Sequence, residues 1–427
     1  MDDIIKKVIG RQIFDSRGTP TVEATVILKS GVAASAAVPS GASTGQFEAH
    51  EKRDGGDEYG GFGVMCAVDN INTTISEILE GESVFDIGEI DKLMIDADGT
   101  ENKQNLGANA MLAVSLATAR AAAYSSDIPL FEYLGGINAV TLPVPMMNIL
   151  NGGAHASNNI DIQEFMIMPT GADSFEDAMR MGTDVYRSLK KLLASKGYST
   201  AVGDEGGFAS NLESDEMALE FIVSSIEKAG YIPQYDINIA LDIASSEWVH
   251  NDGYLLKKQN MFYTKHELIE HILSLKNKFP IISIEDPLGD TDFDGFSEIT
   301  AKGNLQIVGD DLFVTNADRL KQGIDKMAAN AILIKPNQIG TLSETLDTIR
   351  LAQKSGYNTI ISHRSGETAD SFIADLAVAV NAGQIKTGAP ARSERVSKYN
   401  RLLQIELSLG NRACYPKNNI IGQGKYL

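Results

Sequence analysis

Two hydrophobic patterns divide the chain. Residues 21–26 alternate polar and apolar side chains, as a half-buried strand does, and residues 35–39 predict a second strand. Apolar residues then recur at helical spacing between residues 64 and 79, and residues 108–123 predict an alanine-rich helix that can pack closely. Because strands come first and helices follow, we predict a small α+β domain over residues 1–136.

After a turn-rich stretch at residues 134–145, short apolar runs alternate with amphipathic segments. The runs lie at residues 239–241, 281–284, 306–308, 332–334 and 359–361. Ser174 and Thr264 each stand three residues before an acidic residue, which predicts the start of a helix at both positions. Repeated strand–helix units predict a parallel sheet in a second domain, residues 137–427.

A charged or polar residue ends each apolar run, at intervals of roughly one strand–helix unit. These residues are Asp242, Glu285, Asp310, Lys335, His363 with Arg364, and Lys386. Functional groups at successive strand ends are typical of the C-terminal mouth of a TIM barrel, whereas a doubly wound sheet concentrates them at one switch point. We therefore predict an α/β fold, a TIM-type barrel preceded by a smaller α+β domain.

Composition narrows the classes of partner. The 427 residues include 57 acidic and 37 basic side chains, a net charge of −20, which disfavours a general nucleic-acid or anionic-membrane surface. Cys66 and Cys414 cannot build a disulfide framework, so a reducing compartment is expected. No run is apolar enough for a membrane span, and the first residues lack the core of a signal peptide. These features predict a cytoplasmic protein.

Three of the strand-end residues, Asp242, Glu285 and Asp310, offer hard oxygen ligands that suit Mg²⁺. Any one of them alone is more often an ordinary solvent-facing acid, but three at consecutive strand ends favour a metal site. The cations that follow around the rim are Lys335, Arg364 and Lys386. Together with a metal, they predict a pocket for a small, multiply charged anion.

The other polar residues, each considered alone, do not indicate a particular function. Glu205 lies in a glycine-rich turn, His155 lies in a flexible loop, and Glu164 lies at the start of a predicted strand. Residues 41–45 match the Gly-x-Ser-x-Gly pattern of a serine hydrolase around Ser43, but the polar residues that follow do not resemble the helix behind such a nucleophile. A hydrolase using Ser43 and a non-enzymatic barrel therefore stay as disfavoured alternatives to a metal-dependent lyase.

An ordered series of segments over essentially the whole chain resembles the enolases. The segments are residues 15–23, 38–45, 151–155, 163–166, 203–207, 241–247, 284–287, 309–312, 335–340, 362–368 and 386–390. The resemblance implies the reversible dehydration of 2-phospho-D-glycerate to phosphoenolpyruvate. It also implies two Mg²⁺ ions, the second arriving with substrate, and a homodimer or a higher homo-oligomer.

The resemblance also implies a role for each site residue. The first ion is held by Asp242, Glu285 and Asp310, and the second by Ser43 on a closing loop. Lys335 is the base for the C2 proton, and Glu205, helped by Glu164, is the acid for the C3 hydroxyl. Since a base must be neutral, neighbouring cations are expected to lower the pKa of Lys335. The remaining implied substrate contacts are His155, Gln163, His363, Arg364, Ser365 and Lys386, in addition to Glu164 and Lys335.

Overall fold

The computed structural model describes residues 3–41 and 45–420, so Ser43 lies outside the described residues. The first region is an antiparallel sheet in the order β1 (Ile5–Phe14), β2 (Pro20–Leu28) and β3 (Ala33–Ala37). Both predicted strands are confirmed, although β3 ends at Ala37 rather than at residue 39. The helices that follow are α1 (Met65–Asn70), a π-helical turn η2 (Ile71–Ile75), α2 (Ser76–Leu79), α3 (Ile87–Asp98), α4 (Ala108–Ser125) and α5 (Leu130–Gly135).

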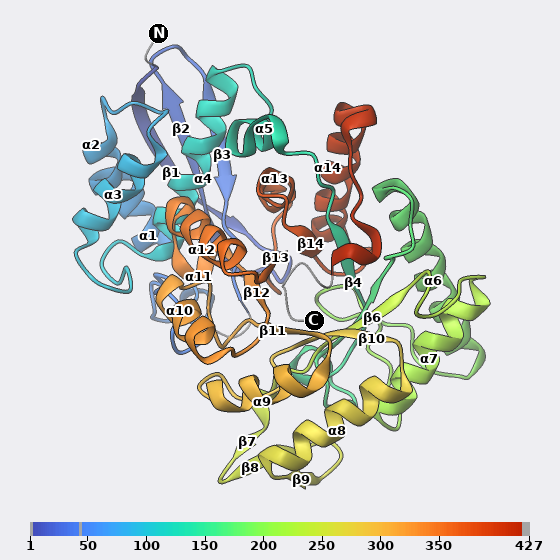
Figure 1. The fold of residues 1–427 in the computed structure, drawn as a ribbon. Coiled ribbons are helices and arrows are strands. Elements are labelled where there is room, and N and C mark those ends of the chain that lie inside the picture. Colours follow the sequence, from blue (N-terminus) through green and yellow to red (C-terminus); the bar gives the residue numbers. More distant parts are fainter. Residues whose placement is uncertain (1–2, 42–44, 421–427) are drawn as a thin grey trace.

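The predicted alanine-rich helix is α4, and it lies across β2 and β3 (Figure 1). Nearly every residue of α4 is buried. Alanine allows this because a side chain of one carbon lets a helix approach its neighbours closely on all sides. The α4 helix therefore joins the first sheet to the rest of the molecule.

The second region is a closed barrel of eight strands, and the predicted TIM-type barrel is confirmed. Its strands are β4 (Val144–Asn151), β5 (Glu164–Met168), β6 (Asn238–Asp242), β10 (Ile281–Glu285), β11 (Gln306–Gly309), β12 (Ala331–Ile334), β13 (Asn358–Ser362) and β14 (Gly383–Lys386). The helices around them are α6 (Phe175–Ser195), α7 (Asp215–Lys228), α8 (Lys265–Lys278), α9 (Phe293–Gly303), α10 (Ala317–Lys326), α11 (Pro336–Ile339), α12 (Leu342–Lys354), α13 (Phe372–Ala379) and α14 (Ser393–Leu409). The capping predictions also hold: the side chain of Ser174 caps α6, and Thr264 forms a capping box with Glu267 at α8.

The predicted parallel sheet holds for every neighbouring pair of barrel strands except the two pairs that include β5. β5 runs antiparallel to both β4 and β6, while the other neighbouring strands are parallel. A parallel neighbour requires a crossover that usually contains a helix, but the connection from β4 to β5 holds only the short turn Gly153–His155. The chain therefore returns antiparallel. As a result, the first residue of β5 lies at the same end of the barrel as the last residues of its neighbours.

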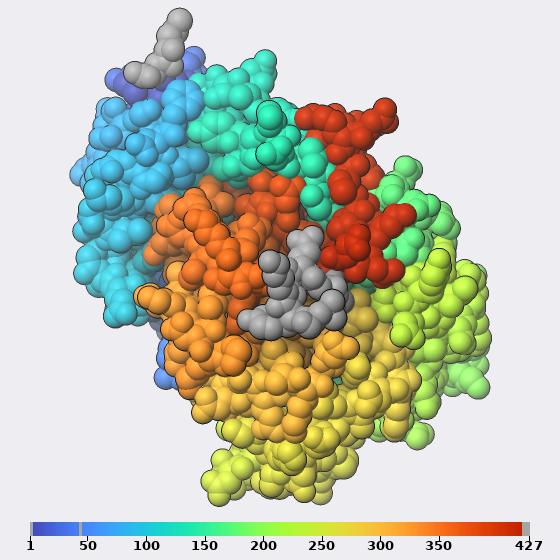
Figure 2. Space-filling model, viewed as in Figure 1, coloured from blue at the N-terminus to red at the C-terminus, as the bar shows by residue number. Residues whose placement is uncertain are grey.

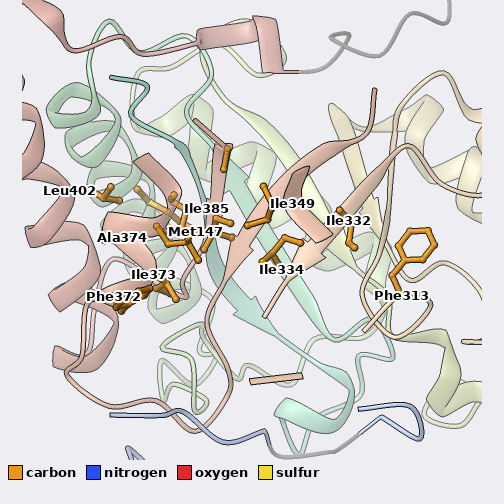
Figure 3. Close-up of a cluster of buried hydrophobic side chains, with 14 of the residues drawn as sticks. Met147, Phe313, Ile332, Ile334, Ile349, Phe372, Ile373, Ala374, Ile385 and Leu402 are labelled. Carbon is orange, nitrogen blue, oxygen red and sulfur yellow. The ribbon is translucent and has the colours of Figure 1, made fainter. Parts of the chain in front are cut away.

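Alternation along each strand separates two apolar cores. On β12, Ile332 and Ile334 pack in the layer between the barrel and its helices, part of which is shown in Figure 3. Leu333, between them, points into the barrel with a second cluster. That interior cluster consists of Val144, Met146, Met166, Met168, Ala240, Val308, Ala331, Leu333, Ile360 and Ile420.

Partly buried ion pairs join the two regions, which form one continuous body in Figure 2. Arg120 of α4 forms two 2.6 Å hydrogen bonds to the carboxylate of Asp370, which precedes α13. The Lys103 Nζ lies 3.0 Å from the Glu344 carboxylate of α12. A small sheet, not predicted from the sequence, is formed by β7 (Val249–His250), β8 (Gly253–Leu256) and β9 (Met261–Tyr263). None of the helices in residues 3–41 and 45–420 is long and apolar enough to cross a membrane.

Candidate active site

The predicted strand-end residues meet at one mouth of the barrel. Asp242, Glu285 and Lys386 are the last residues of β6, β10 and β14, and Asp310 and Lys335 directly follow β11 and β12. A pocket at this mouth is lined by Gly41, Glu48, His155, Gln163, Glu164, Glu205, Asp242, Ala244, Glu247, Asp286, Asp310, Asp311, Lys335, Ser362, His363, Arg364, Ser365 and Lys386. Among the predicted site residues that the structure describes, only Glu285 does not line it.

Lys386 is the central cation of the site. Its side chain is 2% exposed, and Nζ donates to Asp242 Oδ2 at 2.8 Å and to both oxygens of Glu285 at 2.8 and 2.9 Å. Nζ also lies 3.4 Å from Glu164 Oε1. Burial alone would lower the pKa of Lys386, but the surrounding carboxylates raise this pKa well above its usual value. Lys386 covers Glu285, which explains why that carboxylate does not reach the pocket surface.

Lys335 has a different environment from the one we expected. Its Nζ contacts Asp310 Oδ2. Burial, Arg364 and Lys386 lower the pKa of Lys335, as expected from neighbouring cations, but the Asp310 carboxylate raises it above its usual value overall. The expectation of a lowered pKa is therefore wrong for this arrangement, because a carboxylate in direct contact outweighs more distant cations.

Gln338 and Thr315 support this side of the site, and neither was predicted from the sequence. Gln338 is buried, its Nε2 donates to Asp310 Oδ1 at 3.0 Å, and its Oε1 accepts from the Thr315 hydroxyl at 2.8 Å. That hydroxyl in turn accepts from the backbone N–H of Lys335 at 2.9 Å. Thr315 has φ +54° and Val314 has φ +45°, unusual values for β-branched residues. The backbone is thus strained at Val314 and Thr315, and Thr315 belongs to the hydrogen-bond network that orients Asp310 and Lys335.

A pair of buried carboxyl groups, Glu164 and Glu205, forms the other side of the pocket. The pKa of Glu164 is raised well above its usual value by burial and by the neighbouring Glu205, which favours its protonated form. Burial opposes ionisation of Glu205, but His155 and His363 lower its pKa well below the usual value. Asn148, also missed from the sequence, donates from Nδ2 to Glu205 Oε2 at 2.9 Å. The pKa values of the two neighbouring carboxyl groups are therefore shifted in opposite directions.

Two histidines face this pair. His155 Nδ1 lies 3.7 Å from Glu164 Oε1 and 3.8 Å from Glu205 Oε1. His363 Nε2 lies 3.6 Å from Glu205 Oε1. Burial lowers the pKa of His363 well below its usual value, so the ring is neutral.

The antiparallel course of β5 explains how Glu164 joins this set. In the strand ladder Glu164 pairs with Asn151 of β4 on one side and with Asp242 of β6 on the other. Gln163, just before the strand, reaches Asp242 Oδ2 at 3.5 Å through Nε2. The sequence placed Glu164 at a strand start, and only the reversed strand direction brings that start to the mouth.

Arg364 lies where the two regions of the molecule meet. Its guanidinium donates to both oxygens of Glu48, at 2.9 and 3.2 Å, and to Asn337 Oδ1 at 3.3 Å. Glu48, from the segment before α1, was not predicted as a site residue. Ser365 lines the same pocket and is 7% exposed. A buried guanidinium that pairs with a carboxylate in this way is also suited to bind a phosphate.

The donor chemistry fits a hard cation. Oxygen ligands surround the pocket, and the ammonium groups of Lys386 and Lys335 now balance Asp242, Glu285 and Asp310. Within the described ranges, the potential ligand atoms of Asp286, Asp310 and Asp311 lie within 4.8 Å of one another, as do those of His155, Glu164 and Glu205. The predicted ligands are not one of these compact groups, since the Lys386 ammonium lies between Asp242 and Glu285. Ser43 lies outside the described residues.

Buried acids and bases around one polar pocket, at the mouth of an α/β barrel, define an enzyme that moves protons on a small anionic substrate. The family description "Enolase, N-terminal domain" matches residues 5–134, and "Enolase, C-terminal TIM barrel domain" matches residues 139–423. A curated protein named Enolase, from a Nitratiruptor species, is 56% identical over 407 residues, 95% of this chain and 97% of the relative. The chain belongs to the enolase family, and its activity is that of a Mg²⁺-dependent lyase of glycolysis.

Proposed function

We propose that this chain dehydrates 2-phospho-D-glycerate reversibly to phosphoenolpyruvate, with Lys335 as the base and the Glu205–Glu164 pair as the acid. The observation that carries the proposal is that one pocket is lined both by a lysine amine and by two buried carboxyl groups whose pKa values are shifted in opposite directions. Removing a proton next to a carboxylate and expelling a hydroxyl requires a base and an acid that act on adjacent carbons.

Lys335 takes the proton from C2 of the substrate. The Lys335 amine must be neutral before it can accept this proton. The Asp310 carboxylate must therefore pair with another cation instead of the Lys335 ammonium. Arg364 and Lys386 then act on Lys335 as neighbouring cations that favour the neutral amine. Gln338 and Thr315 hold Asp310 and the Lys335 backbone in place while this contact changes.

The acid pair supplies a proton to the departing C3 hydroxyl. Glu164, whose pKa is raised, is the protonated member of the pair in this proposal, and Glu205, whose pKa is lowered, lies beside it under His155 and His363. Glu205 is the residue that meets the hydroxyl, and Glu164 is its proton reserve. Because Lys386 contacts Glu164 as well as Asp242 and Glu285, it couples the charge of this pair to the rest of the site.

Substrate binding involves the remaining predicted residues. Arg364 and Ser365 bind the phosphate, and Arg364 exchanges its pairing with Glu48 for the substrate anion. Lys386 binds on the carboxylate side of the substrate. Gln163 and His155 close the pocket from the loop before β5, and His363 orients the groups around Glu205.

Asp242, Glu285 and Asp310 would hold the first Mg²⁺, and Ser43 would join a second that arrives with substrate. Bound Mg²⁺ supplies positive charge that stabilises the extra negative charge formed when C2 loses its proton. The fit is supported by the three oxygen donors, each of which already contacts an ammonium group here. The second ion rests on the family resemblance.

Location, assembly and domain organisation complete the proposal. The protein is cytoplasmic, supported by the two free cysteines. It assembles as a homodimer or a higher homo-oligomer. The domain boundary lies between residues 136 and 137, supported by the left-handed Gly136 (φ +70°) between α5 and the barrel.

The test separates proton removal from dehydration. Lys335→Ala is expected to abolish exchange of the substrate C2 proton with solvent, measured by NMR in deuterium oxide. Glu205→Gln is expected to retain that exchange while phosphoenolpyruvate formation, followed by absorbance, is lost. Lys278→Ala is a matched control, because its ion pair with Glu216 is exposed on α8. Exchange that persists in Lys335→Ala would show that another residue is the base.

Chelation of Mg²⁺ distinguishes this proposal from a hydrolase using Ser43. Chelation is expected to abolish phosphoenolpyruvate formation, and a fluorophosphonate probe is expected to leave the protein unlabelled. Labelling of Ser43 together with metal-independent activity would contradict the lyase mechanism.

A further inference from the structure

The first turn of α14 holds a buried arginine that the proposed mechanism does not use. Arg395 has a fully buried side chain. Its Nη1 donates to His363 Nδ1 and to the Arg364 carbonyl, both at 2.6 Å, and its Nη2 donates to the Ser365 carbonyl at 2.6 Å and the Asp204 carbonyl at 3.1 Å. One guanidinium thus contacts both the predicted phosphate-binding segment and the residue before Glu205.

The backbone leaves room for this side chain. Gly388 adopts φ +83°, and a Cβ there would lie only 2.8 Å from Arg395 Cδ. A side chain at residue 388 would be strained by this φ and would collide with Arg395. Glycine in the turn after β14 therefore leaves the space that the Arg395 side chain occupies. An arginine enclosed in this way has a fixed orientation, so the four acceptors define where its N–H groups point.

The contact with His363 fixes a tautomer. A guanidinium has only donors, so His363 Nδ1 must accept and therefore carries no proton. A neutral imidazole then has its single proton on Nε2. That Nε2 has no hydrogen-bond partner in the described part of the chain and lies 3.6 Å from Glu205 Oε1. The ring consequently directs an N–H donor, rather than a lone pair, at the carboxylate of the acid.

We propose that Arg395 is a positioning residue that holds His363 as the neutral Nε2–H tautomer facing Glu205. This inference rests on the proposed role of Glu205. When Glu205 has given its proton to the departing hydroxyl, the Nε2–H stabilises the carboxylate that remains. The opposite tautomer would place a lone pair against that carboxylate and disfavour proton transfer.

The tautomer itself is measurable without substrate or metal. The protein has six histidines, so imidazole ¹⁵N labelling with two-dimensional NMR, assigned by the signal lost in His363→Gln, reports on this ring. The wild type is expected to show the bonded proton on Nε2, and Arg395→Lys is expected to show a mixture of tautomers. A proton on Nδ1 in the wild type, or an unchanged Nε2–H ring in Arg395→Lys, would overturn the proposal.

A double-mutant cycle tests the consequence for catalysis. Arg395→Met is expected to lower kcat by about 10²-fold, because it loses the oriented donor. If Arg395 acts through His363, Arg395→Met combined with His363→Gln falls no lower in kcat than His363→Gln alone. Losses in kcat that multiply would show that Arg395 acts independently of His363, and would overturn the proposal.

Two comparisons keep the test decisive. Arg401→Met, on the same helix, removes hydrogen bonds to Asp375 at 2.6 and 2.8 Å and is expected to lower stability without changing kcat. Where Arg395→Met does not fold, His363→Gln is expected to retain more activity than His363→Asn, because only glutamine places an amide nitrogen near the position of Nε2. Equal activities would contradict the proposal. Full activity of Glu205→Gln, by contrast, would overturn the proposed function itself.

Discussion

The interior of the barrel differs at its two ends, although the same strands build both. At the mouth, Lys386 and Lys335 are buried among carboxyl groups and are held by direct ion pairs. Deeper inside, β12 contributes Leu333 to a cluster of aliphatic side chains with no charge among its members. Burying charge costs free energy that only correct pairing offsets, whereas burying aliphatic groups stabilises without regard to partners. The mouth therefore provides chemistry, and the aliphatic cluster provides stability that offsets the cost of the buried charges.

The largest expected effect comes from removing the central cation of the mouth. Lys386→Met leaves Asp242, Glu285 and Glu164 without their shared ammonium. We expect kcat to fall by about 10³-fold and the free energy of unfolding to fall by about 3 kcal/mol, because the partners remain buried. Steady-state kinetics and urea denaturation measure both. A variant with unchanged stability would show that the carboxyl groups neutralise themselves by protonation.

The matching change in the apolar interior is Leu333→Ala. It removes a fully buried side chain and is expected to lower the free energy of unfolding by about 2–5 kcal/mol. Since Leu333 does not line the pocket, kcat at a temperature well below unfolding is expected to stay within about twofold of the wild type. A large loss of kcat in the folded variant would show that the two ends of the barrel are not separable.

The third prediction concerns pH, to which the mouth is expected to respond and the aliphatic cluster around Leu333 is not. Burial holds the pKa of His363 below its usual value in the folded chain, whereas the unfolded chain binds a proton near pH 6.5. Below that pH the unfolded state gains a proton that the folded state does not, so the free energy of unfolding decreases as the pH is lowered. At pH 5.5 this costs the wild type at most about 1.4 kcal/mol, the limit reached when the folded ring binds no proton. Urea denaturation measures this effect. His363→Gln is expected to lose less unfolding free energy between neutral pH and pH 5.5 than the wild type does, whereas Leu333→Ala is expected to lose as much as the wild type.

The smallest expected effect lies at the edge of the mouth. Lys258 Nζ donates to the carbonyls of Gly153 at 2.8 Å and Ala156 at 3.0 Å, on either side of His155. Lys258→Met is expected to cost about 1 kcal/mol of stability, because the ammonium is partly exposed. We expect the KM for substrate to rise a few-fold with kcat little changed. A fall in kcat as large as that of Lys386→Met would mean that this loop takes part in the chemistry.

The barrel and most of its site were predictable because local patterns encode them. Apolar runs that end in Asp242, Glu285 or Lys386 specify both a strand and its functional end, and the structure brings these residues together. The resemblance to the enolases contributed the roles of residues such as Glu205, which its own turn did not specify. The direction of β5 was not predictable from the same signals, because a strand has the same pattern in both directions and only the missing crossover helix indicates reversal.

The supporting residues were missed for a different reason. Gln338, Thr315 and Arg395 act through partners distant in sequence, and each is an ordinary polar residue within its own segment. Their importance comes from burial and hydrogen-bond geometry. The expected direction of the Lys335 pKa failed in the same way, since the contact with Asp310 depends on how two strand ends face each other.

The reversed strand changes which insertions the mouth can accept. For Asp242 and Glu285, the variable loop follows the functional residue in the chain, whereas for Glu164 it precedes it. A residue added between Gly152 and Gln163 would reshape the rim yet leave Glu164 in its ladder pairing. A residue added just after Glu164 would shift the rest of β5 by one position and turn each interior side chain outward. Engineers who graft new loops onto this barrel should therefore place them upstream of Glu164 and downstream of the other strand-end acids.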